Sequence, residues 1–443
     1  MRVCIVGAGY VGLVTGLGLA DIGHHVTCVD RDQARVDLIN SGEPPFYEEG
    51  VAEQLRTHGG ERLRAISSVA HGVLDADLTM LAVGTPFDGE QISLRQIEQA
   101  SRDVGAALAE KDAYHVVVVK STVVPGTTES VVVPILEEVS NKRAGRDFGV
   151  GMNPEFLREG NAVADFMKPD RIALGAIDQR TQDVMAELHK PFSDAEVVRT
   201  TPKTAEMIKY ASNSLLATLI SFSNEIANLA AQVGVDAMDV MRGVHFDKRL
   251  TPIAEDGSRL WPGILTYLEP GCGFGGSCFP KDVKSLIAFA EQIDSSMPLL
   301  RAVIDVNEGQ PGKMLELLGR HFPDVKGVAV TVLGMAFKPG TDDIRESPSL
   351  TVTGELVTRG AEVTVFDPAA HQPVFEVYGD QVRYANTLED AVADADAILL
   401  MTRWPEFLGL PDVLRSQQRQ PVVVDGRRLL DKGSTEVYEA IGL

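Results

Sequence analysis

The sequence has few cysteines, no long apolar run and a shortage of positive charge. Its four cysteines (Cys4, Cys28, Cys272 and Cys278) lack the spacing of a zinc site, and the first two lie in apolar, strand-like runs. We therefore expect no metal site and a reducing, cytoplasmic setting. No stretch reaches the roughly 18 uninterrupted apolar residues that a membrane span needs, so no membrane association is expected.

Acidic residues outnumber basic ones. Lys and Arg together number 41, whereas Asp and Glu number 63, which gives a formal net charge of −22. A field of that sign repels phosphate backbones and anionic lipid headgroups, so nucleic acid is not expected as a partner. Any phosphorylated ligand must be bound by local basic residues and helix N-termini.

The order of strand-like and helix-like segments predicts an α/β fold with three regions. Short β-branched runs alternate with helix-like segments in residues 1–200, and this alternation returns in residues 313–443. Residues 201–312 are predicted to be helical and begin with one helix of roughly 30 residues. We expect two doubly wound, Rossmann-like domains joined by a long central helix and a helical region through which subunits dimerise.

A glycine-rich segment near the N-terminus predicts a dinucleotide site. Gly7, Gly9 and Gly12 follow an apolar strand and open a helix, which permits a tight turn and close approach of the backbone to a pyrophosphate. Asp30 ends the second strand, where its carboxylate can bind the ribose hydroxyls and repel a 2′-phosphate. The segment therefore predicts NAD rather than NADP, although Arg35 lies nearby.

A second glycine-rich segment, GCGFGGSCFPKD, surrounds Cys278. Its glycines let the backbone approach a ligand closely and leave amide groups available for an anion. Cys278 lies where a following helix would begin, and a helix N-terminus and a nearby cation both favour a reactive thiolate. Cys278 is therefore the candidate nucleophile, whereas Cys272 is interpreted as a small buried hydrophobic residue.

Seven motifs together resemble the UDP-glucose/GDP-mannose 6-dehydrogenase family along essentially the whole chain. They are GAGYVGLVTG, VGTP, KSTVVPGT, NPEFLREG, AEMIKYASN, GFGGSCFPKD and AFKPGTDDIRESP. The resemblance implies oxidation of the primary alcohol of a nucleotide sugar to the acid, with two NAD molecules used in succession. It further implies a thiohemiacetal and then a thioester on Cys278, and a C-terminal domain (313–443) that binds the nucleotide sugar.

The resemblance gives catalytic roles to residues that would otherwise be interpreted as caps or surface charges. Lys209 and Asn213, four residues apart on the predicted helix, would stabilise an oxyanion. Asp282 would assist proton transfer and Glu155 the hydrolysis of the thioester, while Thr122 would hold the catalytic water or the nicotinamide region. The predicted catalytic residues are Cys278, Lys209, Asn213, Asp282, Glu155 and Thr122.

The same resemblance implies two sets of binding residues. The predicted cofactor residues are Gly7, Gly9, Val11, Gly12, Asp30, Arg35, Thr85, Thr122, Glu159, Lys281 and Arg345. The predicted substrate residues are Glu155, Phe156, Leu157, Arg158, Glu159, Lys209, Asn213, Arg249, Tyr267, Leu268, Glu269, Pro270, Gly271, Gly275, Lys338 and Arg427. Among them, Arg249 is expected to reach the site of a neighbouring subunit.

The identity of the substrate depends mainly on the resemblance. The segment between Arg249 and Gly271 is longer than in relatives, and Glu269 stands where several relatives carry a basic or neutral residue. The wider set of matches favours UDP-glucose, with GDP-mannose as the main alternative. Two other hypotheses are a protein that senses NAD or a nucleotide sugar without chemistry, and a two-electron dehydrogenase of the hydroxy-acid type.

Overall fold

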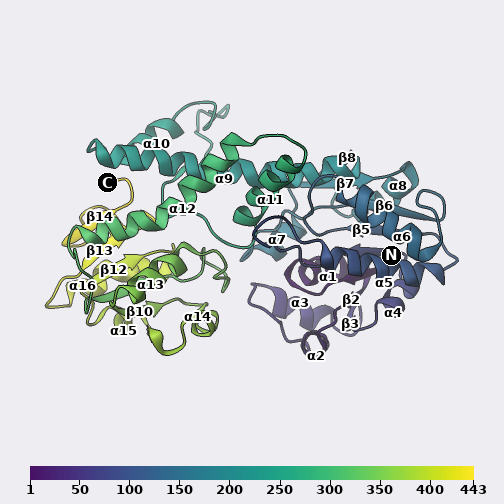
Figure 1. Cartoon of the computed structure of the whole chain (residues 1–443), viewed down its shortest axis with the longest axis horizontal. Helices are drawn as coiled ribbons and strands as arrows, with labels where there is room; N and C mark the ends of the chain where they lie inside the picture. Colours follow the sequence, from purple (N-terminus) through teal and green to yellow (C-terminus); the bar gives the residue numbers. More distant parts are fainter. The chain divides into compact units, whose positions relative to one another are not determined.

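The computed structural model describes residues 1–443, and the chain divides into two compact units, Met1–Ser212 and Asn213–Leu443. Each unit contains one sheet with helices on its faces (Figure 1). The predicted α/β class with two doubly wound sheets is confirmed. The boundaries at residues 200 and 312 stay predictions, because the second unit contains both the helical region and the second sheet.

The first unit is built on an eight-stranded sheet with the order β3-β2-β1-β4-β5-β6-β7-β8. Its strands are β1 (Arg2–Val6), β2 (His25–Val29), β3 (Leu63–Ile66), β4 (Leu78–Leu81), β5 (His115–Val119), β6 (Phe148–Met152), β7 (Arg171–Ala176) and β8 (Glu196–Thr200). Alternate residues of β1 enter different cores, Val3 and Ile5 on one face and Cys4 and Val6 on the other. The central strands are therefore buried on both faces, which explains their continuous apolar runs.

Helices cover both faces of this sheet. They are α1 (Tyr10–Asp21), α2 (Gln33–Ser41), α3 (Val51–His58), α4 (Val69–Asp75), α5 (Arg95–Ala109), the π-helical turn η1 (Thr128–Val132), α6 (Val133–Ser140), α7 (Ala162–Met167) and α8 (Gln179–Leu188). The chain then enters α9 (Pro202–Gln232), whose 31 residues confirm the predicted long helix. This helix crosses the division between the two units.

The first sheet is not parallel throughout, although strands that alternate with helices are typical of parallel βαβ units. Strands β6 and β7 pair antiparallel, whereas the other pairs are parallel. A parallel pair needs a crossover back to the opposite edge, but the connection between β6 and β7 stays at the edge where β6 ends. The motif NPEFLREG directly follows β6 and so lies at the carboxyl edge of the sheet, where open α/β sheets bind ligands. The reversal keeps the rest of the connection to β7 at the same edge.

The second unit has a six-stranded parallel sheet with the order β11-β10-β9-β12-β13-β14. Its strands are β9 (Ala329–Leu333), β10 (Glu362–Phe366), β11 (Arg383–Tyr384), β12 (Ala397–Leu400), β13 (Val422–Asp425) and β14 (Val437–Ala440). Its helices are α10 (Ala237–His245), η2 (Gly263–Leu268), α11 (Phe279–Gln292), α12 (Pro298–Gly319), α13 (Pro348–Thr358), α14 (His371–Tyr378), η3 (Gly379–Gln381), α15 (Leu388–Val392), η4 (Pro405–Gly409) and α16 (Leu410–Arg415).

A buried carboxylate on α9 fixes the turn that follows β5. Glu206 is fully buried and accepts three hydrogen bonds, from the N–H of Gly126 at 2.5 Å and from the N–H and hydroxyl of Thr128 at 2.8 and 2.6 Å. These bonds satisfy donors at the start of the π-helical turn, which would otherwise be buried without partners. The turn after β5 is thereby joined to the beginning of α9.

We predict that Glu206→Ala destabilises the protein by about 3 kcal/mol, because three buried donors lose their acceptor. Urea unfolding followed by circular dichroism measures the effect. Glu129→Ala, which removes an exposed carboxylate from the same turn, is the matched control and should change stability by about 0.5 kcal/mol or less. Equal urea midpoints for the two variants would show that the three hydrogen bonds to Glu206 do not stabilise the turn.

Candidate active site

The glycine loop of the first unit has the geometry of a dinucleotide site. Gly7 has a φ of +101°, and a Cβ there would lie 2.5 Å from the carbonyl oxygen of Ala82. A Cβ on Gly12 would lie 1.8 Å from the carbonyl oxygen of Gly7, whereas a Cβ on Gly9 would meet no protein atom within 4 Å. Helix α1 begins directly after Gly9, so its free N–H groups face the open side of the loop.

Asp30 is fixed beside this loop. Its carboxylate accepts the N–H of Ala8 at 2.9 Å and the N–H of Asp32 at 3.0 Å, and it pairs with the guanidinium of Arg35 at 3.1 Å. The structure thus brings together Gly7, Gly9, Gly12, Asp30 and Arg35 from the predicted cofactor set. Their arrangement fits the adenosine half of NAD, in which an acidic residue at the end of β2 binds the ribose.

Two further predicted residues meet at the ends of neighbouring strands. The hydroxyl of Thr85, in the loop after β4, donates to the carbonyl oxygen of Thr122, in the loop after β5, at 2.7 Å. These loops lie at the same carboxyl edge as the glycine loop. The predicted places of Thr85 and Thr122 beside the nicotinamide half of the cofactor remain predictions.

The motif NPEFLREG is held against α1 by a residue that sequence reasoning missed. Glu48 accepts the N–H groups of Gly160 and Ala162 at 2.6 and 2.7 Å and the hydroxyl of Tyr10 at 2.5 Å. It lies in an irregular segment, so no periodic pattern singles it out. Its role as an anchor for the motif comes from these three hydrogen bonds, which join the motif to Tyr10 on α1.

Glu155 and Lys209 form a buried ion pair within the first unit. The Lys209 ammonium lies 2.8 Å from one carboxylate oxygen of Glu155, and the N–H of Leu157 donates to the other oxygen at 2.6 Å. The ring of Phe156 faces the guanidinium of Arg171 at 4.0 Å and the Lys209 ammonium at 5.6 Å. Three predicted site residues, Lys209, Leu157 and Phe156, are therefore gathered around the carboxylate of a fourth, Glu155.

Glu155 is ionised despite its burial. Burial opposes the charged form, but the charge and hydrogen bond of Lys209, the N–H of Leu157 and the charge of Lys120 together hold its pKa below the usual value. The carboxylate is thus available as a base at neutral pH. Lys120 belongs to the motif KSTVVPGT, but only the structure brings its charge near Glu155.

Cys278 occupies the position expected from the sequence in the second unit. It is the N-cap residue of α11 and is partly exposed, and its sulfur lies 3.6 Å from the hydroxyl of Ser277. The preceding loop is closely packed, since a Cβ on Gly275 would lie 2.3 Å from the carbonyl oxygen of Glu346. Cys278 therefore combines access with a helix N-terminus, the setting of a reactive thiolate.

The other three cysteines are unsuited to nucleophilic chemistry. Cys4, Cys28 and Cys272 are fully buried. Burial raises the pKa of Cys4 and of Cys28 to about 12 and also raises the pKa of Cys272. They remain thiols at neutral pH, which agrees with their interpretation as small buried residues.

Asp282 lies one turn after Cys278 and is bound to two predicted site residues. It accepts the side-chain amide of Asn213 at 2.6 Å and the ammonium of Lys281 at 2.5 Å. Asn213 and Asp282 are both buried, so this contact is shielded from water. Helix α9 carries Asn213 one turn after Lys209.

Two predicted substrate residues of the second unit, Arg427 and Glu269, are fixed by contacts within the protein. Arg427 donates to the carbonyl oxygens of Met401 and Gly273 at 2.7 and 2.9 Å. Its own carbonyl oxygen accepts two bonds from Arg403, which also forms an ion pair with Glu269. Glu269, the unusual acid of the sequence, is therefore paired within the protein by Arg403, a residue that sequence reasoning missed.

The structure does not bring all predicted residues to these clusters. Arg249 is exposed and pairs with Asp247. The side chain of Arg345 pairs with Asp343, whereas its carbonyl oxygen accepts the N–H of Gly276 in the glycine-rich loop at 2.8 Å. The Lys338 ammonium lies over the ring of Phe337 at 5.3 Å. The expected contacts of these three residues with cofactor or substrate remain predictions.

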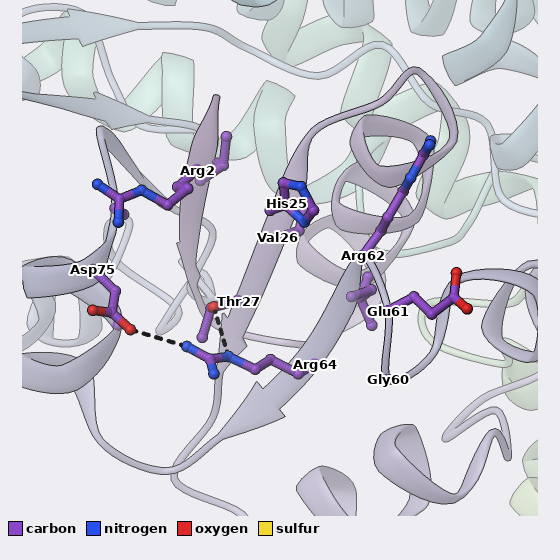
Figure 2. A pocket seen from close by; sticks show the side chains of 13 residues that line it. Arg2, His25, Val26, Thr27, Gly60, Glu61, Arg62, Arg64 and Asp75 are labelled. Atoms are coloured by element: carbon purple, nitrogen blue, oxygen red, sulfur yellow. Dashed lines mark hydrogen bonds and ion pairs between the residues drawn. The ribbon is translucent and has the colours of Figure 1, made fainter.

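The cavity shown in Figure 2 belongs to the first unit and lies at the edge of the sheet opposite the glycine loop. It measures about 330 Å³ and lies at the amino ends of β1, β2 and β3. Arg64 crosses it to reach Asp75 and Thr27 at 3.1 and 3.2 Å. Because open α/β sheets bind ligands at the carboxyl edge, we assign no ligand to this cavity.

Two other features bear on the kind of protein. None of the helices is both long and apolar enough to cross a membrane. No group of three or more His, Cys, Asp or Glu side chains could hold a metal ion.

Three family models match successive parts of the chain. Residues 1–193 match the NAD binding domain of the UDP-glucose/GDP-mannose dehydrogenase family, residues 203–309 its central domain, and residues 331–432 its UDP binding domain. UDP-glucose 6-dehydrogenase AglM of Haloferax volcanii is 42% identical over 446 residues, which covers 100% of both chains. The chain belongs to this dehydrogenase family. The predicted NAD cofactor is confirmed by the same matches.

Two other relatives show the range of this similarity. GDP-mannose 6-dehydrogenase of Pseudomonas aeruginosa is 39% identical and covers 90% of this chain and 91% of its own. The structure of a UDP-glucose dehydrogenase from Pyrobaculum islandicum is 39% identical, with a TM-score of 0.89 and coverage of 100% of this chain and 97% of that chain. The family resemblance inferred from the motifs is confirmed.

We predict opposite outcomes for two alanine substitutions in the glycine loop. Gly9→Ala should leave the thermal midpoint unchanged but weaken NADH binding about tenfold or more, because its Cβ meets no protein atom and occupies the space that a pyrophosphate needs. Gly12→Ala should lower the midpoint itself, because its Cβ overlaps the backbone of Gly7. Thermal unfolding and fluorescence titration with NADH separate the two effects. Undiminished NADH binding by Gly9→Ala would be evidence against this cofactor position.

Proposed function

We propose that the protein oxidises UDP-glucose to UDP-glucuronate in two NAD-dependent steps through a thioester on Cys278. The observation that carries the proposal is an accessible cysteine at the N-terminus of α11, one turn before the buried Asn213–Asp282 contact. Full-length similarity to UDP-glucose 6-dehydrogenases supports the nucleotide sugar. GDP-mannose is the alternative substrate, because a GDP-mannose 6-dehydrogenase is 39% identical.

The chemistry requires a base, a nucleophile and donors for an oxyanion. NAD, when bound, accepts two electrons in each oxidation. The Cys278 thiolate adds to the aldehyde carbon formed in the first oxidation, and the carbonyl oxygen becomes an oxyanion. The Lys209 ammonium and the Asn213 amide are the proposed donors to this oxyanion, which typically contribute about 3 kcal/mol each.

Hydrolysis of the thioester needs an activated water. We assign Glu155 as the base that takes a proton from this water, because its carboxylate is ionised and buried. Water then adds to the thioester carbon, the C–S bond breaks, and the acid leaves while Cys278 returns as a thiolate. Asp282 is assigned to proton transfer during the reaction, and Thr122 is assigned to orient the water or the nicotinamide. The four free cysteines agree with action in the reducing cytoplasm.

The proposal predicts two NADH molecules for each sugar oxidised. Absorbance at the NADH band, with UDP-glucose and GDP-mannose tested side by side, measures stoichiometry and nucleotide preference together. Cys278→Ala should abolish acid formation, whereas Cys272→Ala, which changes a buried thiol, should retain it. One NADH per sugar, or unimpaired turnover by Cys278→Ala, would exclude the covalent route. No NADH from either sugar would favour a sensing protein.

We also propose that the protein is a homodimer through α9. Leu215, Phe222 and Leu229 are 55, 46 and 58% exposed, and their spacing of seven residues places them along one side of the helix. Such a row of large apolar side chains is typical of an interface rather than of a solvated helix. Arg249, exposed in the same unit, is the residue proposed to reach the partner's site.

We predict that Phe222→Glu converts the dimer into a monomer, because a charge would be buried at the centre of the row. Light scattering after size exclusion measures the molar mass. Ile293→Glu changes another exposed apolar residue, which is 61% exposed and follows α11 rather than lying in the row on α9, and should leave the mass unchanged. A dimer that persists in Phe222→Glu would place the interface elsewhere.

A further inference from the structure

Lys120 is a buried lysine that the chemistry above does not use. It directly follows β5, and only 6% of the residue is exposed. Its ammonium donates a hydrogen bond of 2.8 Å to the side-chain oxygen of Asn153, an uncharged amide. Buried lysines normally lie against carboxylates, because an isolated charge is costly away from water. The position of this charge therefore calls for an explanation other than a local ion pair.

The titratable groups that face Lys120 come from three elements. Glu155 lies in the loop after β6, Lys209 on α9, and His189 at the end of α8. His189 is neutral, because burial lowers its pKa to about 4 even though its ring bonds to the carbonyl oxygen of Met185. Glu155 is thus the one anion among these groups and faces two lysines.

Lys120 remains charged at neutral pH. Burial is the largest cause that lowers its pKa to about 8, the charge of Lys209 adds to this lowering, and Glu155 opposes it. The ammonium is therefore mostly protonated at pH 7. Its charge persists without a direct carboxylate partner.

The hydrogen bond to Asn153 links Lys120 to the loop that carries Glu155. Its side-chain amide donates to the carbonyl oxygen of Ala173 on β7 at 2.9 Å, and its backbone N–H donates to the carbonyl oxygen of Val119 at 2.9 Å. Both ends of the Asn153 side chain are therefore fixed. Glu155, two residues further on, extends from a rigid strand end.

We propose that Lys120 is a positioning residue that keeps Glu155 ionised while the reaction proceeds. This role rests on the function proposed above for Glu155 and Lys209. If Lys209 gives a proton to a reacting group, Glu155 loses the charge of its direct partner inside a buried site. Lys120 then remains as the cation that stabilises the carboxylate. Asn153 holds the Lys120 ammonium in a fixed position relative to the loop of Glu155.

The test compares Lys120→Met with a matched control, Lys111→Met. Lys111 is also a buried lysine of the first unit, and its ammonium donates to the carbonyl oxygens of Val73, Leu74 and Ala76. The charges that act on Lys111 do not include Glu155 or Lys209. The two variants therefore remove the same buried group, but only one of them removes it from beside Glu155.

The primary measurement is a carbon-13 NMR titration of glutamate-labelled protein, with the Glu155 signal assigned through Glu155→Gln. We expect Lys120→Met to raise the pKa of Glu155 by about one unit, because a buried carboxylate loses a nearby cation. Lys111→Met should leave it unchanged, and Lys120→Arg should largely restore it. Since the carboxylate is the active form, the acid limb of kcat in Lys120→Met should move to higher pH by the same amount, with the wild-type rate approached at alkaline pH.

An unchanged Glu155 titration in Lys120→Met overturns the proposal, and so does an equal shift in Lys111→Met. A kcat that falls by one factor at every pH, without a shift of the acid limb, also overturns it, because general structural damage would have that effect. The NMR titration does not depend on turnover, so a wild-type protein that forms no NADH would refute the proposed function alone. If the Met variant does not fold, Lys120→Gln, which can still bond to Asn153, replaces it.

Discussion

The ion pair between Glu155 and Lys209 is the interaction on which the first unit's site depends. Taking both charges out of water costs more than their attraction returns unless other bonds satisfy them. The N–H of Leu157 and the ring of Phe156 supply such contacts, and both belong to the same short loop. The loop after β6 and the beginning of α9 are therefore held by electrostatics, and removal of either partner would leave a buried charge.

Strand direction explains why this loop lies where it does. The antiparallel return from β6 to β7 keeps residues 153–170 at the carboxyl edge, beside the loops that follow β1, β4 and β5. Polar anchors then hold each connection, Glu48 for the loop after β6 and Glu206 for the turn after β5. The rigid sheet supplies fixed strand ends, and these carboxylates transmit that rigidity to segments without regular structure.

The two sheets carry an aspartate at matching positions, at the end of the second strand of each. Asp30 accepts three bonds, one of them from the partly exposed Arg35. Asp367 accepts five, from the N–H groups of Met335, Ala336, Ala369 and Ala370 and from the indole of Trp404. A carboxylate has about four acceptor positions, so Asp367 is saturated by its own protein, whereas Asp30 keeps acceptor capacity for the predicted ribose contact.

Features that depend on neighbours in the chain were determined by the sequence alone. The glycine loop, Asp30, the long helix and the place of Cys278 at a helix start follow from local conformation, because each needs only a few adjacent residues. Tertiary structure decided the direction of β7, the anchoring contacts of Glu48 and Glu206, and the pairing of Glu269 with Arg403. It also decided the position of Lys120 near Glu155. A polar side chain acquires such a role only when folding buries it beside a partner from a distant segment, where water no longer competes. Local sequence patterns do not show which distant residue that partner is.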